Sequence, residues 1–215
     1  MHTLMCLLCA ALSETVVFIL CLAVARRLDE EENSRLHPGQ KAFWMLLCVG
    51  NSFPIVLLLV RTRWMTERDV VLLGAAAGGL LFACLTDTQR CKVYDFVWWL
   101  ELMSGVLLMY PEPRCWPFVW GQFVCFLFLQ NFLFSRFYGR ADVYAFCTCG
   151  LLESVFGMGI LGEFLHMAGA FLFLAIVQGF RNNIGTDGNL KRPVPFLPYI
   201  VLSFWTTLLA HDLLR

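Results

Sequence analysis

The chain has 215 residues, of which 59% are hydrophobic, and its mean hydropathy is +0.69. Soluble domains are about 45–50% apolar, and here the excess lies in long runs rather than in scattered positions. The formal net charge is zero, which gives no reason to expect a nucleic-acid partner. The composition therefore excludes an ordinary soluble domain and indicates a polytopic membrane protein.

Eight apolar runs are candidates to cross a bilayer as helices, which takes about 17–25 residues each. They cover residues 4–25, 43–60, 70–86, 96–110, 116–134, 142–160, 163–180 and 196–213. The fourth run is short. The break between the sixth and seventh runs rests on the glycines of Phe156–Gly159 and Leu161–Glu163. We therefore predict an all-α bundle of about eight transmembrane helices in a lipid bilayer.

The ten cysteines indicate packing rather than metal binding or disulfide formation. No two pairs of cysteines have the spacing of a zinc site. Cys6, Cys9, Cys147 and Cys149 lie inside apolar runs, where Cys packs as a small apolar residue. We predict neither a metal nor another cofactor.

Positive charge is distributed unequally between the loops on the two sides of the predicted bundle. Loops 26–42, 87–95, 135–141 and 181–195 together hold eleven Lys and Arg residues, whereas the other side holds five. An excess of Lys and Arg marks the cytoplasmic side of a membrane protein. Both chain ends are therefore predicted outside, and Asp87 and Asp142 at the cytoplasmic face.

Asp87 closes the third run and Asp142 opens the sixth, with the fourth and fifth runs between them. Those two helices cross the membrane and return, so the two helix ends can meet. Two adjacent carboxyls cannot easily both ionise, so they share one proton. One then polarises a water while the other protonates a carbonyl oxygen, which hydrolyses an amide without a metal. The alternative is that each Asp only caps a helix.

Three motifs resemble those of the prepilin peptidase family of membrane aspartyl proteases. Thr86–Asp95 is similar to the first aspartate motif, in which an Asp ends a helix, basic residues follow, and an Ile/Val-Pro-Asn/Asp triplet comes next. Gly139–Val143 is similar to the Gly-x-Gly-Asp-Val-Lys signature. Val194–Tyr199 resembles the late Pro-Phe-x-Pro element that begins the last helix. The motifs occur in the family's order.

The resemblance implies a six-helix peptidase core in residues 70–215, preceded by two further helices in residues 1–69. It implies an aspartyl endopeptidase of the bacterial cytoplasmic membrane. Its substrates would be type IV prepilin-like, membrane-anchored proteins, whose short basic leader peptides are cleaved at the cytoplasmic face. On this resemblance Asp87 and Asp142 are the catalytic pair, supported by the signature residues Gly139, Ala141, Pro195, Phe196 and Pro198.

The chain departs from the family pattern at three positions. Ala141 stands where the family has its second Gly, Tyr144 where it usually has Lys, and Tyr94 where it usually has Pro. The cytoplasmic domain with two Cys pairs of bifunctional members has no counterpart, which argues against N-methyltransferase activity. These departures leave open an inactive copy of the fold that acts as a scaffold or transporter.

Asp95 competes with Asp87 as the first catalytic aspartate. Tyr94 and Asp95 also resemble the Tyr-Asp pair of presenilin-like intramembrane proteases, although the flanking basic residues fit the prepilin pattern better. Asp87 is therefore the first choice and Asp95 the alternative. The residues that we expect to line the site are Glu101, Lys92 and Arg140.

Three further ionisable residues lie in the last predicted helices. Glu153 lies roughly 16 Å further along its helix than Asp142, at 1.5 Å per residue, which is too far for direct chemistry with it. We expect Glu153 to bond across helices. Glu163 and His166 are three positions apart, and we expect them on a solvated turn at the outer side rather than in a metal site.

Overall fold

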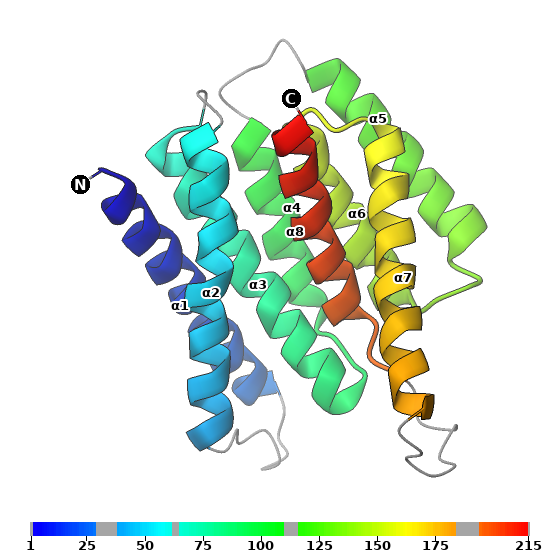
Figure 1. Cartoon of the computed structure of the whole chain (residues 1–215), viewed down its shortest axis with the longest axis horizontal. Helices are drawn as coiled ribbons and strands as arrows, with labels where there is room; N and C mark the ends of the chain where they lie inside the picture. Colours follow the sequence, from blue (N-terminus) through cyan, green and yellow to red (C-terminus); the bar gives the residue numbers. More distant parts are fainter. Residues whose placement is uncertain (1, 29–37, 62–64, 110–115, 184–193, 215) are drawn as a thin grey trace. The chain divides into compact units, whose positions relative to one another are not determined.

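The computed structural model describes residues 2–28, 38–61, 65–109, 116–183 and 194–214, and every regular element in these ranges is a helix. Each predicted run coincides with one of eight α-helices (Figure 1), so the all-α prediction is confirmed. The helices are α1 (His2–Leu28), α2 (Pro38–Arg61), α3 (Glu67–Arg90), α4 (Asp95–Met109), α5 (Trp116–Leu129), α6 (Arg140–Val155), α7 (Ile160–Asn183) and α8 (Leu197–Leu214). A π-helical turn, η3 (Gln130–Phe134), extends α5.

Within the described ranges, four helices are long and apolar enough to cross a membrane, namely α1, α3, α7 and α8. Shorter apolar stretches lie in α2 (Gly50–Val60) and in α5 with η3 (Trp120–Phe134). These features fit a membrane protein. The total of about eight spans and the orientation in the membrane stay predictions.

The chain forms two compact units. Unit 1 comprises Met1–Ala83 and Tyr94–Tyr110, and unit 2 comprises Cys84–Val93 and Pro111–Arg215. Helix α3 therefore belongs to unit 1 up to Ala83, and its last turns belong to unit 2. The predicted boundary between residues 69 and 70 follows from the family resemblance, and the compact units do not test it.

Two glycines let α1 and α3 approach closely in unit 1. Gly74 and Gly78 are one helical turn apart on α3, and a Cβ at Gly78 would clash with the main-chain oxygen of Glu14 on α1. Small residues spaced in this way are a common means of close packing between membrane helices. Helix α2 adds polar contacts, since Asn51 Nδ2 and Ser52 Oγ each donate a hydrogen bond of 3.1 Å to the Glu14 carboxylate.

We expect Gly78→Ala to lower the free energy of unfolding by about 1–3 kcal/mol, because an extra methyl group in a tight contact forces the main chain apart. The measurement is chemical unfolding in detergent micelles. Gly50→Ala is the control, because a Cβ at Gly50 of α2 would have nothing within 4 Å. That control is expected to leave the stability unchanged or to raise it, since Ala favours helix. Equal losses in the two variants would contradict the close α1–α3 contact.

In unit 2, α5 packs against α6, and α8 packs against both α6 and α7. Helices α6 and α8 run in the same direction and α7 runs opposite to them (Figure 1). The turn between α6 and α7 covers Phe156–Gly159, the first of the two glycine-containing segments on which the predicted break rests. Gly157 has φ of 74°, a backbone conformation that glycine adopts readily.

The second glycine-containing segment, Leu161–Glu163, was expected in the turn but forms the start of α7. Gly162 serves packing instead, since a Cβ there would come within 2.7 Å of Met158 Cε. The predicted end of the sixth run at residue 160 and start of the seventh at residue 163 are therefore corrected to Val155 and Ile160.

Candidate functional site

Asp87 lies near the end of α3, and its side chain is 8% exposed. Its Oδ2 accepts a 3.0 Å hydrogen bond from the main-chain N–H of Leu197, the first residue of α8. The first N–H groups of a helix have no partner within it and favour a negative charge. Asp87 therefore caps the start of α8 rather than its own helix.

The late proline motif explains why α8 begins where it does. Pro198 is the second residue of α8, a position in the first turn where a missing N–H costs no helical hydrogen bond. Pro195 precedes the helix and is half-buried. The N–H of Leu197, the first residue of the helix, donates to Asp87.

Asp142 lies in the first turn of α6 and is partly exposed. Its Oδ2 accepts a 3.1 Å hydrogen bond from the main-chain N–H of Gly139. The φ and ψ of Gly139 are −68° and 160°, which any residue adopts. A Cβ at Gly139 would lie 3.3 Å from Asp142 Oδ2. The glycine therefore keeps the space beside the carboxylate open.

The two predicted catalytic aspartates belong to the same compact unit, and their carboxyl groups interact electrostatically. Asp142 lies in the first turn of α6, and the Leu197 N–H that binds Asp87 is at the start of α8. These helices run in the same direction (Figure 1), so both starts lie at one end of unit 2.

An aromatic cluster supports this end of unit 2. The ring of Phe196 lies 5.0 Å from that of Phe171, 6.0 Å from that of Phe146 and 6.4 Å from that of Tyr138. Phe146 is buried one helical turn after Asp142 on α6. Phe196 of the late proline motif thus packs against Tyr138 and Phe146, which lie on either side of the Gly139–Val143 segment in the sequence.

The remaining predicted site residues occupy different environments. In unit 2, Lys92 is exposed, Arg140 is exposed at the first position of α6, and Ala141 beside it is partly exposed. In unit 1, Asp95 is exposed at the first position of α4. Glu101 is also in unit 1 and fully buried, with its carboxylate against Gly79, where a Cβ would clash with it.

The expectation of a solvated turn at Glu163 and His166 is wrong. Both side chains are fully buried, because α7 begins at Ile160 and includes them within its first two turns. The expectation that Glu153 bonds across helices is confirmed, since its Oε1 lies 2.9 Å from Nδ1 of His166 on α7. In the part of the chain that the structure describes, no three His, Cys, Asp or Glu side chains are placed to hold a metal ion.

Comparison with known proteins adds no assignment. No family model matches the sequence, and no curated protein or solved structure matches it.

Proposed function

We propose that this protein is a membrane-embedded aspartyl endopeptidase similar to the prepilin peptidases. In this proposal Asp87 and Asp142 form the catalytic pair, and the substrates are type IV prepilin-like precursors cleaved at the cytoplasmic membrane face. The observation that carries the proposal is the hydrogen bond between Asp87 and Leu197, 110 positions apart in sequence. It joins the first aspartate to the late proline motif, and Asp142 lies in the first turn of α6 at the same end of unit 2.

The proposed chemistry needs one proton on the pair. The ionised carboxylate polarises a water for attack on the peptide carbonyl carbon, and the protonated carboxyl donates its proton to the carbonyl oxygen. The ionised carboxylate takes a proton from the attacking water and passes it to the leaving amine when the tetrahedral intermediate collapses. A hydroxyl of the intermediate then returns its proton to the other carboxylate, so the pair regains its first state. The hydrogen bonds from Leu197 and Gly139 orient the two carboxyls through their Oδ2 atoms. Such fixed orientation lowers the entropic part of the barrier.

A second candidate is a non-enzymatic scaffold or transporter with the same fold. It is favoured by the hydrogen bonds themselves, because Asp142 accepts from Gly139 at the start of its own helix and Asp87 accepts at the start of α8. Both are ordinary capping interactions. The departures at Ala141 and Tyr144 from the family signature point the same way.

Cleavage by the reconstituted protein distinguishes the two candidates. Wild type and Asp142→Asn are placed in liposomes with several prepilin-like precursors from the same genome, and the new N-terminus is read by mass spectrometry. Asn keeps an oxygen that accepts from Gly139 but cannot carry the proton, so we expect a loss of about 10²–10⁴-fold. A folded wild type that cleaves no precursor, or an Asp142→Asn variant as active as wild type, would favour the non-enzymatic candidate.

A further inference from the structure

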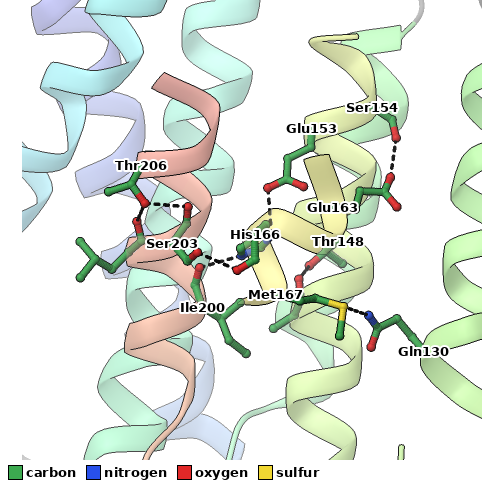
Figure 2. Close-up of polar contacts among 12 residues, drawn as sticks. Gln130, Thr148, Glu153, Ser154, Glu163, His166, Met167, Ile200, Ser203 and Thr206 are labelled. Carbon is green, nitrogen blue, oxygen red and sulfur yellow. Dashed lines mark hydrogen bonds and ion pairs between the residues drawn. The ribbon is translucent and has the colours of Figure 1, made fainter. Parts of the chain in front are cut away.

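A buried polar network connects α6, α7 and α8 in unit 2 (Figure 2). His166 of α7 stands at its centre and is fully buried, as are Glu153 of α6 and Glu163 of α7. The imidazole Nδ1 lies 2.9 Å from Glu153 Oε1, and Nε2 lies 2.9 Å from the main-chain oxygen of Ile200 on α8. The His166 side chain, which comes from α7, therefore bridges α6 and α8.

The hydrogen-bond partners determine how this bridge is protonated. A main-chain oxygen only accepts, so Nε2 of His166 carries a hydrogen toward Ile200. Nδ1 lies 2.9 Å from a carboxyl oxygen of Glu153, close enough for an ion pair with a protonated imidazole. With the proton on His166 or on Glu153, the pair has no net charge. A buried pair of this kind is stable only with both members present, because removing one leaves an unpaired polar group.

Of the two helices that this imidazole bridges, α6 carries Asp142 and α8 carries the Leu197 N–H that binds Asp87. Ile200 lies in the first turn of α8, three residues after Leu197, whose N–H donates to Asp87. Glu153 lies on α6, eleven residues after Asp142. The bridge is thus roughly 16 Å from the second aspartate, along a continuous helix that rises 1.5 Å per residue.

A second contact fixes α8 on α7 at the same level. Ser203 Oγ donates a 2.7 Å hydrogen bond to the main-chain oxygen of His166. Gly169, less than one turn further along α7, leaves room for Ser203, since a Cβ there would clash with its Oγ. Helix α8 therefore has little freedom to slide along α7 while the bridge to α6 is intact.

We propose that His166, held by Glu153 and Ile200, is a positioning residue for the Asp87–Asp142 pair. It sets the axial register of α6 against α8, and so the position of Asp142 relative to the Leu197 N–H that orients Asp87. This inference rests on the proposed peptidase function. A displacement of about 1 Å in a catalytic group lowers turnover by up to about 100-fold, so the register of the two helices matters for catalysis.

The chain offers a matched control next to Glu153. Ser154 is also buried on α6, and its Oγ donates a 3.0 Å hydrogen bond to Glu163 Oε1. That bond joins α6 to α7 but does not reach α8 (Figure 2). Ser154→Ala therefore removes a buried hydrogen bond of the same region without cutting the bridge between α6 and α8.

The first test compares kcat and KM per folded protein in liposomes for wild type, Glu153→Leu, Glu153→Gln and Ser154→Ala. Glu153→Leu is expected to lower kcat by about 10- to 100-fold at unchanged KM. Glu153→Gln is expected to stay close to wild type, because its amide donates to Nδ1 of a neutral imidazole. Ser154→Ala is expected to keep the wild-type kcat. An unchanged kcat in Glu153→Leu, or an equal loss in Ser154→Ala, would overturn the proposal.

The second test does not require cleavage. Hydrogen exchange of the Leu197 amide reports its bond to Asp87, and we expect faster exchange in Glu153→Leu than in wild type, Glu153→Gln or Ser154→Ala. If wild type cleaves nothing, the peptidase proposal fails, while the exchange rates still decide whether the bridge sets the register. If Glu153→Leu does not fold, Glu153→Asp replaces it, because it keeps the acid and shortens the side chain by one methylene. If the Leu197 amide of Glu153→Asp exchanges at the wild-type rate, the proposal is overturned.

Discussion

Asp87→Asn is expected to lower cleavage by about 10³-fold or more while the protein stays as stable as wild type. The Asn side-chain oxygen still accepts the hydrogen bond from the Leu197 N–H, so the start of α8 remains capped. The amide cannot take up and release the proton that the reaction requires. The measurements are precursor cleavage in liposomes and the thermal unfolding midpoint in detergent, made on the same preparation.

Two companion variants separate catalysis from capping. Asp87→Ala removes both the proton carrier and the acceptor, so we expect it to be inactive and also less stable, by about 1 kcal/mol for a lost cap. Asp95→Asn changes an exposed carboxylate at the start of α4 and is expected to remain active. If Asp87→Asn is active and Asp87→Ala is less stable than wild type, Asp87 serves only as a helix cap. Loss of activity in Asp95→Asn alone would move the first catalytic aspartate to Asp95.

Phe146→Ala is expected to lower the free energy of unfolding of the protein by about 3 kcal/mol. The ring is fully buried on α6 and lies 5.3 Å from the His166 ring, 5.4 Å from that of Tyr138 and 6.0 Å from that of Phe196. Truncation leaves a cavity between these groups. The value is at the low end for Phe→Ala because a membrane protein unfolded in micelles does not expose the ring fully to water, so lost packing contacts dominate.

The measurement is equilibrium unfolding in detergent micelles, with Phe180→Ala as the control. Phe180 lies on α7 and is 65% exposed, so its truncation removes few contacts within the protein. We expect little change in stability from it. A loss in Phe180→Ala as large as that in Phe146→Ala would mean that the Phe146 ring contributes no packing beyond what an exposed ring provides.

The apolar runs were sufficient to predict where the helices form, because only helices satisfy their own backbone hydrogen bonds in hydrocarbon. The helix ends were less predictable. Both glycine-containing segments after Val155 were equally good candidates for a turn, yet only Gly157 takes a positive φ. Gly162 lies in α7 and leaves room for Met158, a contact that local sequence does not specify.

Some features of the candidate site were likewise predictable from the sequence, whereas others depend on the tertiary structure. The sequence by itself determined that Asp87 ends one apolar helix and Asp142 begins another, since the edges of apolar runs depend on residues close in the chain. Only the tertiary structure decided that Asp87 binds the start of α8 and that His166 is buried between Glu153 and Ile200. Asp87 and Leu197 lie 110 positions apart along the chain, and His166 and Ile200 lie 34 positions apart. Which side of a helix faces its neighbours depends on packing across the whole unit. The sequence of a helix that is apolar all round does not show which side that is.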